Sequence, residues 1–484
     1  MRAPAPEPPG YQRHRPEDTV LYKVVSTWLP RFIEKTEAAG GLPPFVERAF
    51  RAYLNCGRLE GGFGRIWCPH CGDDLLVAFS CKTRGLCPSC GARRMMDTAA
   101  HLVDRVIPRV PVRQWVLTFP FELRTMLAYD ARLAAAVRRI FLCEVERHYR
   151  CTAREQGIRR GRTGSVTVAQ RFGGALNLNL HLHSIFLDGV YHRRTPTSTP
   201  VFVTSPELDD ASVAKVLAEV RRKVAQLFVA RGLLEADTSD DSEPGALAQL
   251  AFASVIGGGA LGGPPSRSRA LRPEPRCGEP KAGRREEAPS PLCARDAGFS
   301  LHARTRVQRQ RRGDLEVLCR YVARPPLADD QLGLRDDGKV ELTFSRPWSD
   351  GTTSMAFEPL VLMARLAALI PLPHLNGVYY SGVLASNSKW RKAIVGKAAG
   401  GLRRPKKPAA GSCAHDRERR LTWAQLLART YAVDILRCAR CGGRRELLAV
   451  VKDPAAIRKI LNHLGLGQPS GSPRGPPPTI LGLL

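Results

Sequence analysis

The sequence predicts an α+β protein: an antiparallel sheet with flanking helices, preceded by a zinc-ribbon-like module and followed by a mostly helical C-terminal region. Three observations support this fold class. Residues 176–183 alternate strictly between leucine and polar side chains, as in a strand that buries one face. Two C-x-x-C motifs precede this strand, and many of the remaining apolar residues recur at helical spacing.

The alternating stretch places His181 and His183 on the same side of its strand. Their Cβ atoms should lie about 6.5 Å apart, so that two neutral imidazoles can converge on one divalent metal ion. Two exposed polar histidines are the alternative, but the regular apolar face and the absence of charge on the polar face favour a metal site. Gly173-Gly174 joins this strand to residues 166–172, which predicts an antiparallel hairpin.

The bulk composition indicates a globular protein with a polyanionic partner. A length of 484 residues predicts two or three domains, and a net charge of +29 favours nucleic acid over a membrane surface. No apolar run is long enough to span a bilayer, and residues 1–10 lack the apolar region of a signal peptide. A cytoplasmic location is therefore expected.

Fourteen cysteines in a reducing compartment indicate metal ligands before disulfides. Cys68 and Cys71 form the first motif, Cys87 and Cys90 form the second, and fifteen residues separate the two. This spacing predicts one structural Zn²⁺ held by all four thiolates, with unligated buried thiols as the alternative. Cys56 and Cys81 are left over: Cys81 is either a replacement ligand or a small core residue.

A third C-x-x-C motif, Cys438 to Cys441, is half of a zinc site. Cys413 and His415 are candidates to complete it, although four ligands are normally required. Cys277 and Cys293 remain unassigned.

The secondary structure can be predicted along most of the chain. Helical spacing predicts helices over 20–53 (two), 97–107, 132–155, 209–233, 314–324, 358–370, 422–436 and 454–464. Strands are predicted over 113–119, 166–172, 299–307 and 339–345. Residues 236–297 show no sustained period and are predicted to be a low-complexity insertion. Asp188 and Asp350 are predicted to be turn residues, because the sequence shows no paired carboxylates.

Several segments together resemble the rolling-circle transposases of the insertion sequence 91 family, including its common-region elements. The segments that carry the resemblance are Phe79-Ser80-Cys81-Lys82, residues 87–95, Trp115 to Pro120, Gln170 to Tyr191, Leu318-Cys319-Arg320-Tyr321-Val322-Ala323-Arg324-Pro325-Pro326, residues 346–353, and the Cys438 motif with His463-Leu464-Gly465. The resemblance covers most of the chain outside its tails and residues 236–297.

The resemblance implies a nuclease domain of the HUH superfamily, in which two histidines flanking a hydrophobic residue hold a divalent metal and a helix-borne tyrosine attacks a DNA phosphate. His181-Leu182-His183 matches the first element, and Tyr321 matches the second. Gln170 is nominated as a third ligand for Mg²⁺ or Mn²⁺. Residues 317 and 325 are valine and proline, so the chain matches the single-tyrosine branch.

Tyr321 lies at the edge of an apolar stripe on the helix predicted over 314–324, between Arg320 and Arg324. A tyrosine at a stripe edge more commonly packs in a core. Tyr379 and Tyr380 are the alternative nucleophiles.

The resemblance divides the chain into a flexible tail (1–20), a helical and zinc-binding DNA-binding module (21–110), the first part of the nuclease domain (111–235), the insertion (236–297), the second part with the tyrosine helix (298–400) and a basic linker with the helical C-terminal region (401–484).

The function implied is nicking and rejoining of single-stranded DNA at transposon ends through a 5′-phosphotyrosine. Candidate DNA-binding residues are Arg84, Arg93, Arg94, Arg320 and Arg324. A non-catalytic zinc-ribbon DNA-binding protein and an inactivated transposase relic are the alternatives, and a replication initiator would use the same chemistry. The sequence leaves the cleaved DNA sequence and the oligomeric state open.

Overall fold

The computed structural model describes residues 14–37, 40–233, 291–348, 350–395, 423–431 and 434–466. These residues form two units. The larger unit draws on Val20–Arg51 and Lys82–Thr422, and the smaller unit draws on Met1–Thr19, Ala52–Cys81 and Trp423–Leu484. The units therefore differ from the predicted domains, because described residues of the predicted zinc-binding module and of the C-terminal region share the smaller unit.

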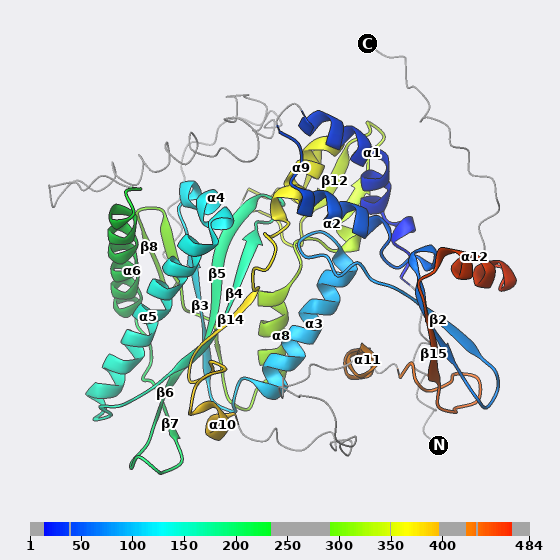
Figure 1. Cartoon of the computed structure of the whole chain (residues 1–484). Coiled ribbons are helices and arrows are strands. Elements are labelled where there is room, and N and C mark those ends of the chain that lie inside the picture. Colours follow the sequence, from blue (N-terminus) through cyan, green and yellow to red (C-terminus); the bar gives the residue numbers. More distant parts are fainter. Residues whose placement is uncertain are drawn as a thin grey trace. The chain divides into compact units, whose positions relative to one another are not determined.

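A seven-stranded antiparallel sheet forms the centre of the larger unit (Figure 1). Six strands follow the order β14-β4-β5-β3-β9-β8, and β10 pairs with the beginning of β3. The strands are β3 (Val112–Thr118), β4 (Gly164–Phe172), β5 (Leu178–Leu187), β8 (Cys293–Asp296), β9 (Phe299–His302), β10 (Arg306–Val307) and β14 (Val378–Gly382). The predicted hairpin is β4 and β5, and the alternating stretch supplies most of β5.

Both faces of β5 are covered, whereas the alternation of its residues predicted one buried face. Leu180 and Leu182 pack in a core with helices α4, α5 and α6, while Ile185 and Leu187 pack in a second core with α3 and α8. Figure 1 shows these two helical layers on opposite sides of the sheet. The helices are α3 (Pro88–Arg105), α4 (Phe121–Tyr129), α5 (Ala131–Glu155), α6 (Asp210–Ala230) and α8 (Arg312–Ala323).

The remaining elements of the larger unit surround this sheet. They are α1 (Val20–Glu37), α2 (Pro44–Leu54, whose last residues belong to the smaller unit), α9 (Pro359–Leu369), α10 (Arg391–Ile394), the pair β6 (Gly189–His192) and β7 (Val201–Thr204), the turn η4 (Asp329–Gln331), and the small sheet β11 (Leu332–Leu334), β12 (Val340–Thr343) and β13 (Ser354–Phe357). No helix among the described residues is long and apolar enough to cross a membrane.

Helix α3 begins nine residues before the predicted start at Asp97. Cys87 precedes the helix and accepts a hydrogen bond from the backbone N–H of Cys90, and Pro88 occupies the first helical position. Both features initiate helices, because proline has no N–H to satisfy there and the cap satisfies another. The helix α4 and the strands β6 and β7 were not predicted. The strand predicted over 299–307 is divided into β9 and β10.

The predicted insertion at 236–297 lies mostly outside the described residues, which resume at residue 291. Its last part is not an insertion. Cys293–Asp296 forms β8 and pairs with β9, so the ordered sheet begins earlier than the composition predicted. Short strands of this length carry too little periodicity to be distinguished from a loop in sequence.

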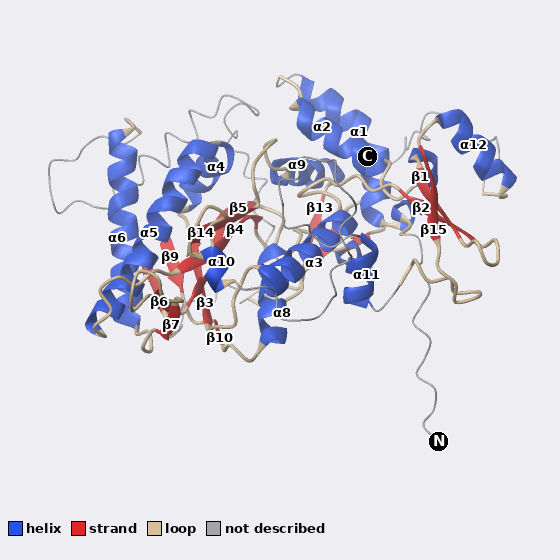
Figure 2. Cartoon of the chain, turned by 60° about the horizontal axis from the view of Figure 1, so that its bottom comes forward, coloured by secondary structure: helices blue, strands red, loops and turns tan. Residues whose placement is uncertain are grey.

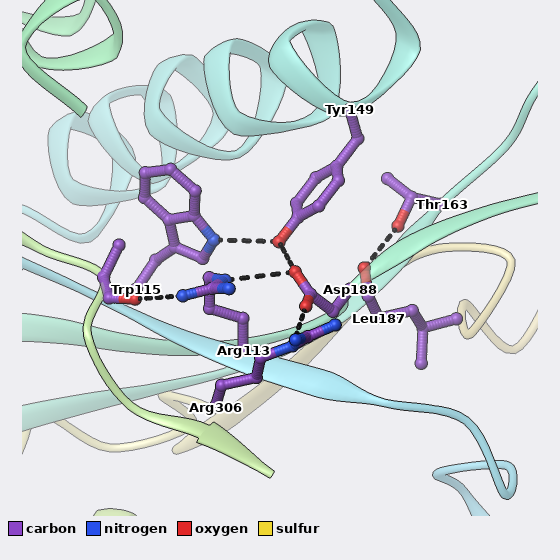
Figure 3. Close-up of polar contacts among 8 residues, drawn as sticks. Arg113, Trp115, Tyr149, Thr163, Leu187, Asp188 and Arg306 are labelled. Carbon is purple, nitrogen blue, oxygen red and sulfur yellow. Dashed lines mark hydrogen bonds and ion pairs between the residues drawn. The ribbon is translucent and has the colours of Figure 1, made fainter. Parts of the chain in front are cut away.

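Asp188 forms a buried polar cluster at the end of β5 (Figure 3). Its carboxylate accepts hydrogen bonds from Arg113 Nε (3.1 Å) and Arg306 Nε (2.6 Å), and from the Tyr149 hydroxyl (3.1 Å). Trp115 Nε1 in turn donates to the Tyr149 oxygen at 3.2 Å. Asp188 lies at the bend between β5 and β6, as predicted for a turn residue. It is also only 1% exposed and is a buried ion-pair partner that joins β3, α5 and β10.

The smaller unit contains a three-stranded antiparallel sheet in the order β15-β1-β2 (Figure 2). Its elements are η1 (Pro16–Asp18), η2 (Leu59–Gly61), β1 (Phe63–Trp67), β2 (Asp74–Ala78), α11 (Trp423–Tyr431), β15 (Glu446–Val451) and α12 (Pro454–His463). Ile457 and Leu461 of α12 pack on Phe63 of β1. Helices were predicted for this C-terminal region and are present, but the strand between them was missed.

Candidate active site and cysteine knuckles

His181 and His183 lie side by side on the face of β5 that carries Ile185 and Leu187. Their ring centroids are 4.8 Å apart. His181 is paired in register with Gln170 of β4 and with Thr118 of β3, so these three side chains form a row across the sheet. His183 is 3% exposed, because the helical layer covers this face. The structure therefore brings the two predicted ligands together in a buried position.

Hydrogen bonds orient both imidazoles. His181 Nδ1 lies 2.8 Å from the backbone oxygen of Asn179; a carbonyl only accepts, so Nδ1 carries the proton and Nε2 keeps its lone pair. His183 Nδ1 lies 2.8 Å from the side-chain amide nitrogen of Gln114. If the Gln114 side-chain amide is flipped by 180°, its oxygen accepts a hydrogen bond from Nδ1–H of His183. Nε2 of His183 then carries a free lone pair, as Nε2 of His181 does.

Both histidines are neutral at physiological pH. Burial lowers the pKa of His181, and the positive charges of Arg324 and Arg124 lower it further. Burial, His181 and Arg324 lower the pKa of His183 to about 3. A neutral imidazole is the form that binds metal ions.

Tyr321 is positioned over the histidines by α8. Its ring is perpendicular to the His183 ring, at an interplanar angle of 87°, with 5.7 Å between the ring centroids. Leu315, Leu318 and Val322 are buried and dock α8 on the sheet, while Tyr321 is 46% exposed. The arrangement keeps the phenol accessible while its ring touches the buried histidine.

Gln170 fastens the end of α8 to β4. Its amide nitrogen donates to the backbone oxygens of Tyr321 (3.1 Å) and Val322 (2.7 Å). These carbonyls belong to the last turn of the helix, where no helical N–H is available to them. Two acceptors at the nitrogen fix the amide orientation, so Oε1 points elsewhere; it is buried and has no hydrogen-bond partner among the described residues.

Two more polar atoms in this region are buried without a partner in the described structure: Asn179 Oδ1, an acceptor, and His183 Nε2, which is an acceptor when the proton is on Nδ1. Asn179 has the same parity on β5 as the two histidines, and it was not singled out from the sequence because asparagine alone is a weak signal. Apart from the two histidines, no His, Cys, Asp or Glu among the described residues adds a third ligand here. Amide oxygens are therefore the available completing donors.

The predicted DNA-binding arginines are placed differently from one another. Arg324 lies over the Tyr321 ring, with 4.8 Å from its guanidinium carbon to the ring centroid. Arg320 instead forms an ion pair with Glu316 one turn earlier. Arg93 is exposed on α3. Arg324 therefore contacts the candidate nucleophile.

A cavity at the C-terminal end of α8 has several arginines in its lining. Its lining includes Gln170, Tyr379 and five arginines, namely Arg84, Arg94, Arg138, Arg171 and Arg324. Arg84 donates to the backbone oxygen of Leu375, and Arg94 donates to that of Lys82 at 2.9 Å. A carbonyl orients a guanidinium without cancelling its charge. Arg138 and Arg171 were not predicted, because a single arginine on a helix or strand gives no signal of its own.

The alternative tyrosines lie on β14. The guanidinium carbon of Arg138 is 3.4 Å from the centroid of the Tyr379 ring, and Tyr380 packs against the core that includes α8. Strand β4 lies between β14 and β5, whereas the Tyr321 ring lies against His183. Their position does not favour them as nucleophiles.

The cysteines do not form the single site predicted from Cys68, Cys71, Cys87 and Cys90. Cys68 and Cys71 instead lie with Cys438 and Cys441, and one sulfur atom from each of these four lies within 4.8 Å of the others. Pairing of β15 with β1 brings the distant motif next to the first one. Cys87 and Cys90 start α3 in the larger unit.

Cys56, left over in the sequence, accepts a hydrogen bond from the Cys81 backbone N–H at 3.4 Å. Cys413 and His415, the proposed partners of the third motif, lie outside the described residues. The third motif is instead completed by Cys68 and Cys71.

Comparison with protein families gave two matches. A transposase model, Y2_Tnp, matches residues 164–391, which include His181, His183 and Tyr321. A transposase zinc-binding domain model of the insertion sequence 91 family matches residues 25–119, which include the first two cysteine motifs. No curated protein and no solved structure matches the chain. The sequence segments and these two models agree: the chain belongs to the insertion sequence 91 family of transposases, which implies that it binds DNA.

Proposed function

We propose that the larger unit is an HUH-type nuclease and that the protein nicks and rejoins single-stranded DNA at transposon ends, as in rolling-circle transposition. One observation carries this proposal: the accessible Tyr321 ring lies directly against His183 of a buried, neutral His pair.

The residues around the His pair suit a divalent cation. Gln170 Oε1, Asn179 Oδ1 and His183 Nε2 are buried polar atoms without a partner among the described residues, and each costs about 1–3 kcal/mol if it stays so. A Mg²⁺ or Mn²⁺ ion bound by them and by His181 would polarise the scissile phosphate. Gln170 keeps its nominated role, and Asn179 joins it as a candidate ligand.

Tyr321 supplies the nucleophile. Its phenol oxygen forms a bond to phosphorus, the bond from phosphorus to the 3′ oxygen breaks, and the phenol proton leaves to solvent while the 3′ oxygen takes up a proton. The products are a 5′-phosphotyrosine and a free 3′-OH. Arg324 is stacked on the Tyr321 ring, where its positive charge can pair with the phosphate under attack. A 3′-OH can later reverse the step, so rejoining requires no ATP.

The arginine-rich cavity supports binding of a single strand. Arg84, Arg94 and Arg324 line it together with Gln170 and Tyr379. The Arg138 guanidinium already lies over one face of the Tyr379 ring, so a base would stack on the other face. Phosphates are neutralised by guanidinium groups, and an unpaired base can stack on an aromatic ring. A duplex would hide the bases from that ring, so the single strand is the substrate that we propose.

The test is covalent capture of a labelled oligonucleotide. Tyr321→Phe removes only the hydroxyl, so DNA binding should survive while the covalent adduct with a nicked single strand, formed in Mn²⁺, disappears. Tyr379→Phe is the matched control and should retain the adduct. Persistence of the adduct in Tyr321→Phe would refute the assignment, and an equal yield on duplex DNA would refute the single-strand preference.

His181→Ala tests the metal. Cleavage should be lost without loss of DNA binding, and high Mn²⁺ should restore part of it. If the wild-type chain binds DNA but never nicks it, the alternative of a non-catalytic DNA-binding protein or an inactivated relic is the correct one.

A further inference from the structure

The C-x-x-C motifs at Cys68 and Cys438 fold into the same turn. In the first motif the N–H of Gly72 donates to the Cys68 oxygen (2.9 Å), and in the other the N–H of Gly442 donates to the Cys438 oxygen (2.9 Å). The backbone N–H of each leading cysteine also donates to the carbonyl oxygen five residues on, at 2.9 and 2.7 Å. Both glycines have positive φ, +71° and +73°, which favours glycine. Two such turns facing each other are typical of a zinc ribbon.

The four thiols have the spacing of a tetrahedral zinc site. Cys68 Sγ lies 3.5 Å from Cys441 Sγ, and Cys71 Sγ lies 3.6 Å from Cys438 Sγ. Zinc–sulfur bonds of about 2.3 Å at tetrahedral angles separate the sulfurs by about 3.8 Å. Disulfides would require about 2.05 Å, and all four cysteines are free. The donor set therefore fits Zn²⁺.

Contacts around the thiols hold the Cys68 motif and the Cys438 motif close to each other. Asp73, which follows the first motif, forms an ion pair with Arg445, which follows the other. Gly443 has no room for a side chain: a Cβ there would lie 2.8 Å from the His70 ring and 3.2 Å from Cys441 Sγ. The β15–β1 ladder extends this interface from Trp67 to Phe63.

We propose that Cys68, Cys71, Cys438 and Cys441 bind one structural Zn²⁺, and that this ion fastens the C-terminal segment to the N-terminal hairpin. The family matches end at residues 119 and 391, so Cys438 and Cys441 lie beyond both. Because 373 residues separate Cys68 from Cys441, the site closes only after nearly the whole chain has been synthesised. This inference is independent of the chemistry at Tyr321.

Alkylation of the unmodified full-length protein tests the site without any mutation. Cys143 and Cys151 are exposed and should react with N-ethylmaleimide at once. Cys441 is also exposed, yet it should stay protected with Cys68, Cys71 and Cys438 until a zinc chelator is added. All four should then react with the same chelator midpoint. Rapid reaction of Cys438 and Cys441 while Cys68 and Cys71 remain protected would overturn the proposal.

Zinc content of paired variants gives a second, independent test. Changing Cys438 and Cys441 to serine should remove one zinc per chain, as should changing Cys68 and Cys71. All four changes together should remove no more than one. The matched control, serine at Cys143 and Cys151, should keep the wild-type content. A normal zinc content in the Cys438/Cys441 variant would refute the shared site. When the changes at Cys68/Cys71 and at Cys87/Cys90 are combined, the zinc lost should equal the sum of the two separate losses. A smaller loss would also refute the site.

Discussion

At the scale of single residues, two groups of buried polar atoms in the larger unit differ in whether their hydrogen bonds are satisfied. Asp188 is fully satisfied by two arginines and a tyrosine, and its role is to hold strands together. Gln170 Oε1, Asn179 Oδ1 and His183 Nε2 are unsatisfied within the described structure. Native proteins leave few buried acceptors in that state, and those few commonly serve a ligand. Satisfaction of hydrogen bonds thus distinguishes the Asp188 cluster from the atoms around the His pair.

Removal of the Asp188 carboxylate should destabilise the sheet. Asp188→Ala leaves Arg113 buried, at 4% exposure, without its counter-charge, which costs about 3–5 kcal/mol. The midpoint of urea unfolding, followed by tryptophan fluorescence, measures the loss. Asp350→Ala is the control, since Asp350 is exposed and only bonds the N–H of Thr352. Equal midpoints for the two variants would contradict the role given to Asp188.

The depressed pKa of His183 predicts a loss of stability in mild acid. The unfolded chain takes up a proton near pH 6.5, whereas the folded chain does so only near pH 3, so stability is full above pH 6.5 and falls between these values. From pH 7.5 to 5.5 the free energy of unfolding should fall by about 1.4 kcal/mol more in the wild type than in His183→Asn. Chemical unfolding without added Mg²⁺ or Mn²⁺ measures it; parallel curves would contradict the prediction.

The packing of α3 on α8 positions the candidate nucleophile at the scale of elements. Gly91 lies in the first turn of α3, and a Cβ added there would lie 2.6 Å from the Cβ of Pro325. Pro325 follows the C-terminal residue of α8, close to Tyr321 in the chain. Gln170 holds the same helix end from the sheet side. The close approach of Gly91 to Pro325, together with the Gln170 hydrogen bonds, therefore fixes the end of the helix that carries the tyrosine.

Gly91→Ala should displace the end of α8. Overpacking costs about 1–3 kcal/mol, and the displaced tyrosine should lower the rate of covalent adduct formation more than it lowers DNA affinity. Gly313→Ala is the matched control, because Gly313 lies in α8 and a Cβ added there would meet nothing within 4 Å. It should raise the melting temperature slightly and leave the rate unchanged. Equal rates in the two variants would show that this packing does not position Tyr321.

At the scale of the whole molecule, the chain order is interleaved. The smaller unit takes residues from the N-terminal part and from the C-terminal part of the chain, and the larger unit takes the intervening residues together with Val20–Arg51. Division of the sequence into consecutive domains, as predicted, could not describe this arrangement. A segment predicted to follow the nuclease domain instead adds a strand to the N-terminal hairpin.

Local sequence was sufficient for the hairpin that carries the site. Strict alternation over residues 176–183 predicts a strand because side chains project alternately, and the strand β5 follows. The same rule put His181 and His183 on one face, as found. The apolar stripe of α8 and the helices α5 and α6 were also predicted. In each, apolar residues recur at helical spacing over enough residues to be distinguished from chance.

The sequence by itself determined which residue types could do chemistry, namely the His pair, the helical tyrosine and the cysteine motifs. Tertiary structure alone decided their partners. Three C-x-x-C motifs look alike in sequence, and only the pairing of β15 with β1 selects Cys438 and Cys441 for Cys68 and Cys71. Gln170 had already been nominated from the sequence, and strand pairing places it opposite His181. The physical reason is that the spacing of residues along the chain specifies only local geometry. Contacts between distant residues depend instead on which strands pair and which helix and sheet faces pack together.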